Sequence, residues 1–211
     1  MMALIQSMLG GTWVSVEIFF LTLIFSIPLA VFFCAARMSK FFPLRKAAQF
    51  FLLLIRGTPL MLQLICVYFI PGILWGWSFD RFVAAIIALS VNYAAYFAEI
   101  YRGGFESVPQ GQREAASVLG YTKKQAFVFI IAPQVVKRIM PAMGNEVITL
   151  VKDTALVTVI GVVELLHVAK SASNRVFSTV PLFFFFFFYF IMNGIVTWAF
   201  AMIEKKLSYY K

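Results

Sequence analysis

Long apolar runs are the feature of this sequence that most restricts its fold. A helix needs about 20 consecutive apolar residues to cross the hydrocarbon core of a bilayer. Backbone groups in lipid must form hydrogen bonds within their own segment, so each such run is expected to be helical. The sequence therefore predicts an all-α, polytopic membrane protein with five transmembrane helices. These predicted spans cover residues 12–36, 48–70, 82–101, 143–166 and 181–203.

The composition agrees with a chain that lies mainly in lipid. Of the 211 residues, 62% are hydrophobic and 13% are charged, whereas soluble domains carry roughly a quarter charged residues. A small water-facing domain has too much surface to hide so much apolar material. We expect no separate soluble domain. The first run lacks a preceding basic segment and a following small-residue cleavage site, which favours a retained span over a removed signal peptide.

Lysine and arginine predict how the chain is oriented, because cytoplasmic connections are enriched in both. The connections alternate between basic-rich and basic-poor, as five spans require, which places the N-terminus outside and the C-terminus inside. The same alternation explains the formal net charge of +9 without a nucleic-acid partner. The basic-rich segments contain Arg37, Lys40, Arg45 and Lys46, then Arg102, Arg113, Lys123, Lys124, Lys137 and Arg138, and finally Lys205, Lys206 and Lys211.

The predicted cytoplasmic loop between the third and fourth spans, residues 102–142, carries local helix signals. Ser107 and Gln110 have the spacing of a capping box that opens a short helix, and Thr122 and Gln125 have the same spacing. Gly120 between them can adopt a left-handed conformation and end the first helix. We therefore predict two short helices that meet at a corner, the second ending before Pro133. An amphipathic loop resting on the membrane surface is the alternative.

Several motifs give the loop and the spans a family resemblance. Glu114, Ala115 and Ala116, followed by Gly120 and then Pro133, resemble the EAA motif of ABC importer permeases, although Ala132 stands where that family usually has leucine. Other segments resemble the polar amino acid branch of the same family. These are residues 55–60 (IRGTPL), 92–100 (NYAAYFAEI), 102–104 (RGG), 144–146 (GNE) and 152–156 (KDTAL).

The resemblance implies a permease domain over residues 12–204, placed in the bacterial cytoplasmic membrane. It further implies that the loop couples this chain to a dimer of ATP-binding ATPase subunits. Other implied partners are a second permease subunit, identical or related, and an extracytoplasmic substrate-binding protein. The residues that the resemblance assigns to ATPase coupling are Glu114, Ala115, Ala116, Gly120 and Tyr121.

Polar side chains inside the spans are candidates for the substrate path, because such groups are costly in lipid. Asn92, Tyr96 and Glu99 follow an i, i+4, i+7 pattern and share one helix face. They would hydrogen-bond an amino acid as it passes, or alternatively hold the helices together. The full candidate set is Thr58, Gln63, Asn92, Tyr96, Glu99, Lys152 and Asp153.

The sequence lacks the motifs that catalysis would need. It has no glycine-rich phosphate loop, so we expect ATP and its magnesium on a separate subunit and no cofactor on this chain. One histidine and two cysteines inside apolar runs give no metal site or catalytic set. An ion-gradient-driven transporter or channel without an ATPase remains the alternative function. The residues leave open which amino acid is carried and whether the permease forms a homodimer or a heterodimer.

Overall fold

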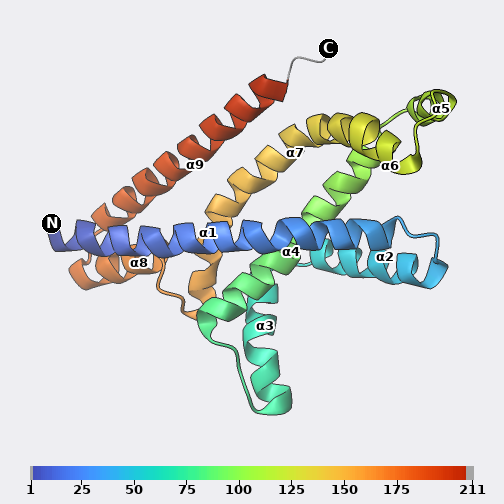
Figure 1. The fold of residues 1–211 in the computed structure, drawn as a ribbon. Coiled ribbons are helices and arrows are strands. Elements are labelled where there is room, and N and C mark those ends of the chain that lie inside the picture. Colours follow the sequence, from blue (N-terminus) through green and yellow to red (C-terminus); the bar gives the residue numbers. More distant parts are fainter. Residues whose placement is uncertain (1, 208–211) are drawn as a thin grey trace.

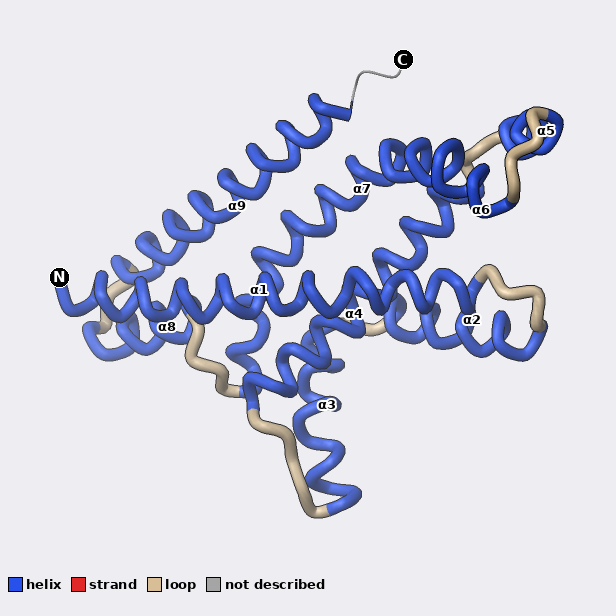
Figure 2. The backbone as a smooth tube through the Cα atoms, viewed as in Figure 1, coloured by secondary structure: helices blue, strands red, loops and turns tan. Residues whose placement is uncertain are grey.

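The computed structural model describes residues 2–207, and this part of the chain is built from helices joined by short connections (Figure 1). Figure 2 shows helices and loops but no strand within the described range. The all-helical prediction is confirmed. The elements are α1 (Met2–Arg37), α2 (Phe42–Gly57), α3 (Leu60–Trp75), α4 (Arg81–Glu106), α5 (Gln110–Val118), α6 (Lys123–Ala126), a π-helix η1 (Phe127–Ile131), α7 (Ala132–Asp153), a 3-10 helix η2 (Thr154–Ile160), α8 (Leu165–Val176) and α9 (Val180–Leu207).

Four helical stretches of the described chain are long and apolar enough to cross a bilayer. They are Leu4–Arg37, Arg81–Glu106, Lys123–Ile160 and Val180–Leu207. The pair α2 and α3 passes the same test only when the two helices are taken together, and they are bent by 108° at their junction. The structure therefore offers four spans, or five if this bent pair counts as one.

The continuous helix expected over residues 48–70 is interrupted, and this part of the prediction is wrong. Thr58 and Pro59 are both extended, with ψ angles of 148° and 132°, and they separate α2 from α3. Proline has no N–H to bond into the preceding turn and disfavours helical geometry at the residue before it. The break is therefore a consequence of the Thr58-Pro59 step itself.

The fourth span also differs from its predicted bounds of 143–166. The helical stretch begins earlier, at Lys123, and ends at Ile160, where Gly161 with a φ of +79° stops the 3-10 helix η2. The next residues form α8, whose first turn is capped by the Glu164 carboxylate, which accepts hydrogen bonds from Leu166 N and His167 N at 2.7 Å each. The predicted span therefore runs past the end of one helix and into the capped start of the next.

Small residues allow the helices around α4 to pack closely. α1 packs mainly against α4, and α4 also contacts α3 and α7. A Cβ on Gly11 of α1 would lie 2.9 Å from the Leu165 Cα, so α1 and the start of α8 approach backbone to backbone. The alanines of α4 serve the same purpose at the centre of the core. Those that are buried are Ala84, Ala85, Ala88, Ala94, Ala95 and Ala98.

The arrangement places the short helices of the loop at one end of the molecule. In Figure 1 the N-terminal part of α1 lies with α8 on the left, while α5 and α6 lie at the upper right. α4 rises toward α6, α7 descends from it, and α9 ends on the upper side of the view. The two groups of candidate residues, at the α2–α3 break and in the loop, are thus carried by different parts of the fold.

Candidate functional site

The break between α2 and α3 exposes backbone carbonyls, and polar side chains fill the gap. The Gln63 amide nitrogen donates to the Ile55 carbonyl at 2.7 Å and to the Thr58 hydroxyl at 2.9 Å. The Thr58 hydroxyl donates in turn to the Leu54 carbonyl at 2.9 Å. Thr58 and Gln63, both predicted for the substrate path, therefore occupy the same polar break and supply the hydrogen bonds that the interrupted helix loses.

α4 presents the predicted polar face to this break. Asn92 Nδ2 donates to Gln63 Oε1 at 2.9 Å, and Asn92 is only 4% exposed. One turn along the same face, the ring of Tyr96 lies under the Arg56 guanidinium, 5.4 Å from its carbon. The i, i+4, i+7 pattern is therefore confirmed as one face that meets α2 and α3.

Glu99 ends this face in a cluster of three arginines, each from a different helix. Its carboxylate lies 2.8 Å from Arg102 on α4, 3.4 Å from Arg37 on α1 and 3.8 Å from Arg56 on α2. A charge in lipid requires such partners. The sequence reasoning did not foresee the cluster, because Arg37 and Arg56 are far from Glu99 in sequence. Only Arg102, three residues along the same helix, gave a local signal.

Lys152 and Asp153 lie apart from the break network. Asp153 accepts a hydrogen bond from the Tyr93 hydroxyl at 2.7 Å, and Tyr93 is buried. Tyr93 follows Asn92 directly, so it points to a different side of α4. The side chain of the adjacent Lys152 is exposed. The structure thus joins Asp153 to α4 through Tyr93, a partner that the sequence did not single out.

The loop forms the predicted cornered pair of helices. α5 ends at Val118, and Gly120, just beyond the C-cap Leu119, has a φ of +78°. Tyr121 N bonds the Ala116 carbonyl at 3.0 Å and Gly120 N bonds the Ser117 carbonyl at 3.1 Å. These two bonds make a Schellman motif, in which glycine adopts the left-handed conformation at little steric cost. The predicted role of Gly120 as the stop of the first helix is confirmed.

Only one of the two predicted capping boxes is present. Thr122 N donates to Gln125 Oε1 at 2.9 Å and Gln125 N donates to the Thr122 hydroxyl at 3.3 Å, which is the predicted second box. The first box is wrong: Ser107 instead ends α4, and its hydroxyl donates to the Gly104 carbonyl at 2.7 Å. Pro109 occupies the N-cap position of α5, and no side chain caps this helix in the described structure.

The sequence predicted that the second helix of the loop ends before Pro133, and this prediction is wrong. The chain stays helical from α6 through η1 into α7, and Pro133 lies in the first turn of α7. A π-turn shifts the hydrogen-bond pattern by one residue and is a known way to change register within a helix. The loop therefore continues into α7 without a break at the proline.

The surface of α5 shows which EAA residues face outward. Glu114 and Ala115 are exposed, whereas Ala116 is 1% exposed. Glu114 accepts a hydrogen bond from the Gln110 amide at 2.8 Å. Val118 and Leu119, at the tip beside Gly120, are 87% and 73% exposed, and Tyr121 is 42% exposed. The sequence reasoning missed Val118 and Leu119, although two apolar residues before a glycine stop in a polar loop are a signal for a docking surface.

Residues 23–209 match the family of binding-protein-dependent transport system inner membrane components. The chain belongs to this family. The arginine transport system permease protein of Bacillus subtilis (strain 168) is 36% identical over 204 residues, covering 96% of this chain and 93% of that protein. The L-cystine transport system permease protein of the same organism is 37% identical over 167 residues, with 79% and 70% covered.

A solved structure of an amino acid ABC transporter with histidines has the same fold as this permease. Its TM-score is 0.87 at 32% sequence identity, covering 95% of this chain and 94% of that chain. The expected membership of the ABC importer permeases is thereby confirmed. This permease is a multi-pass membrane subunit of an ATP-driven importer, in a family whose members are transport components and work with an ATPase and a binding protein.

Proposed function

We propose that this permease imports polar amino acids across the bacterial cytoplasmic membrane by alternating access. Its N-terminus is outside, its C-terminus is inside, and α2 with α3 forms one broken span among five. Residues 12–204 make up the permease domain. The support for an amino acid substrate is the relatives at 36% and 37% identity, which are named for arginine and L-cystine transport.

The observation that carries the proposal is the exposed tip of α5. A small helix that leaves Val118 and Leu119 open to water, and carries Glu114 and Ala115 on its surface, has the composition of a docking element. In this family the partner that must be reached is the ATPase. Closure of the ATPase dimer would move α5, and the continuous path α6–η1–α7 would carry that movement into the membrane. ATP and its magnesium stay on the ATPase subunits.

The substrate path in this proposal runs past the α2–α3 break. Gln63, Thr58 and Asn92 offer amide and hydroxyl groups there. These groups match the ammonium and carboxylate of an amino acid, both of which need hydrogen bonds when they leave water. The remaining candidates for the substrate path are Tyr96, Glu99, Lys152 and Asp153. Of these, Glu99 has the clearest alternative role, since its ion pairs with arginines hold helices together.

The test is uptake by the complex in liposomes. The tagged permease is purified with its ATPase, reconstituted with the binding protein outside and ATP inside, and given labelled arginine, cystine or histidine. We expect accumulation of one or more of these amino acids that requires both ATP and the binding protein. Uptake that follows an ion gradient and persists without the ATPase would instead support the alternative of a gradient-driven transporter or channel.

A further inference from the structure

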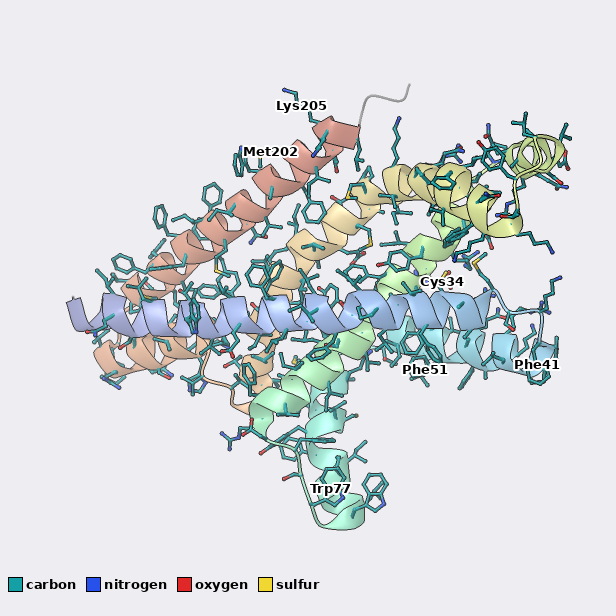
Figure 3. The ribbon with its side chains drawn as sticks, in the orientation of Figure 1. Cys34, Phe41, Phe51, Trp77, Met202 and Lys205 are labelled. Atoms are coloured by element: carbon teal, nitrogen blue, oxygen red, sulfur yellow. The ribbon has the colours of Figure 1, made fainter. Side chains whose placement is uncertain are left out.

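A large cavity lies between the loop helices and the adjoining ends of three long helices. Its volume is about 860 Å³, within the range of roughly 300–1,000 Å³ that holds small-molecule ligands. Its walls come from α1, α4, the segment from α5 to η1, and α7. Figure 3 places Cys34, one of the lining residues, near the end of α1 and below the loop helices.

The cavity has an apolar part and a basic part. Val31 of α1, Tyr101 of α4 and Val136 of α7 line the part that belongs to the spans. Arg113 of α5 and Lys123 of α6 line the part made by the loop, and no carboxylate occurs among the lining residues. Apolar groups thus mark the membrane side, and two cations mark the water side.

The basic part is held in place by local contacts. A terminal guanidinium nitrogen of Arg113 donates to the Phe105 carbonyl at 3.4 Å, which fixes this side chain against the end of α4. The nearby carboxylates face elsewhere: Glu106 pairs with Arg102, and Glu114 accepts from Gln110 at 2.8 Å. Both carboxylates line an adjoining pocket of about 670 Å³, which shares Met38, Phe105, Arg113 and Ser117 with the larger cavity. The positive charge in the larger cavity is therefore not cancelled from within it.

We propose that this cavity binds an anionic phospholipid of the cytoplasmic leaflet. An acyl chain lies against the apolar walls, and the phosphate bonds Arg113 and Lys123. Basic pockets between membrane helices on the cytoplasmic side suit acidic headgroups, and each lysine or arginine near the surface strengthens such binding. A polar amino acid lacks the apolar tail that these walls require. The cavity is open at α1, since Val31, one of its lining residues, is 58% exposed.

This site goes beyond transport of the substrate but uses the orientation proposed above. The lipid would touch α1 and α4 on one side and the loop helices on the other, so its presence would set the position of the loop relative to the spans. An anionic lipid is therefore expected to support coupling between ATP hydrolysis and uptake.

The test compares binding of two lipids to the intact complex by native mass spectrometry. Delipidated complex is titrated with dioleoylphosphatidylglycerol or dioleoylphosphatidylcholine, and the fraction that retains lipid is measured. We expect preferential retention of phosphatidylglycerol. Each of Arg113→Gln and Lys123→Gln should weaken it about fivefold. Lys124→Gln is the matched control, because Lys124 is exposed and adjacent but does not line the cavity.

A second variant tests the apolar part of the cavity without changing a charged residue or a residue of the loop. Ala35→Phe fills the cavity from α1 and should also lower phosphatidylglycerol retention, whereas Ala201→Phe, on the exposed surface of α9, should not. Equal retention of the two lipids, or no response to any cavity variant, would overturn the proposal. If Ala35→Phe instead releases the second permease subunit while lipid retention is unchanged, a protein helix occupies the cavity and the proposal is wrong.

Lipid retention needs neither ATP nor substrate, so the lipid site and the proposed transport function can be refuted independently. A complex that keeps phosphatidylglycerol but shows no ATP-dependent uptake would contradict the proposed function alone. A complex that transports normally with no lipid preference would contradict only the lipid site.

Discussion

The loop and the α2–α3 break are both interruptions of regular helix, but they are held in different ways. At residues 107–125 most bonds join close neighbours in sequence, as in the Gly120 stop and the Thr122–Gln125 box. At the break the deciding bond, Asn92 to Gln63, joins residues 29 positions apart on α4 and α3. The loop is thus shaped mainly by bonds within its own sequence, whereas the break, which the Thr58-Pro59 step creates, is also joined to α4 by a tertiary contact that changes if the helices move.

The largest expected effect is at the exposed surface of the loop. Glu114→Lys reverses the charge of one exposed side chain of α5 without disturbing a buried group, so insertion into the membrane should stay normal. We expect substrate-stimulated ATP hydrolysis by the reconstituted complex to be abolished. Glu204→Lys, the same change on an exposed residue near the end of α9, is the control and should hydrolyse ATP normally. Normal coupling in Glu114→Lys would remove the loop from the mechanism.

The next effect separates transport from assembly at the break. Asn92→Leu leaves the half-buried Gln63 without its α4 donor, and the loss of such a hydrogen bond costs about 1 kcal/mol. Uptake in liposomes should fall by roughly fivefold or more, while the amount of assembled complex stays close to that of the unaltered protein. Asn193→Leu is the control, since the Asn193 amide bonds the Tyr189 carbonyl of its own helix at 2.9 Å. Unchanged uptake in Asn92→Leu would make Asn92 a structural residue.

A smaller effect is expected at the corner itself. Gly120→Ala places a Cβ on a residue with φ of +78°, which costs about 1–2 kcal/mol for an L-residue. The corner should open part of the time, so ATPase stimulation should be reduced rather than lost. Gly111→Ala is the control, because Gly111 lies at an exposed helical position with open space around it. This variant should leave ATPase stimulation unchanged or slightly increased. Equal stimulation in both variants would mean that the corner geometry is not needed.

The smallest effect tests whether the loop is encoded locally. Thr122→Ala removes one side of the capping box, which costs about 1 kcal/mol. Faster hydrogen exchange should appear in α6 and the neighbouring turn but not at the α2–α3 break. Thr149→Ala is the control, because that hydroxyl bonds the Asn145 carbonyl one turn back in α7. Faster exchange at the break as well would show that the two regions are coupled more tightly than their contacts indicate.

The sequence predicted features that depend on nearby residues better than features that depend on distant ones. Apolar length predicted the helical spans, and glycine and capping-box chemistry predicted the Gly120 corner and the Thr122 cap. The break at Thr58-Pro59 was missed, since the long apolar run over residues 48–70 was taken as one span. The α8 helix was missed because residues 164–166 were included in the fourth span, whereas Glu164 caps the start of a new helix.

The long-range partners were beyond the reach of sequence reasoning. The face of Asn92, Tyr96 and Glu99 follows from helix periodicity, but nothing in the sequence places Arg37 or Arg56 against Glu99. Tyr93 was passed over as a partner of Asp153 for the same reason. Such pairs depend on how helices cross, which is set by the packing of small residues such as Gly11 and the α4 alanines.

The most direct test of the central claim is photo-crosslinking from the tip of α5 in intact cells. A photoactivatable amino acid replaces Leu119, which is 73% exposed, and the control position is Phe186 on α9, which is 67% exposed. The coupling account predicts a covalent product between position 119 and the ATPase subunit, and none from position 186. If position 119 never captures an ATPase while the complex is intact and active, α5 is not the coupling element.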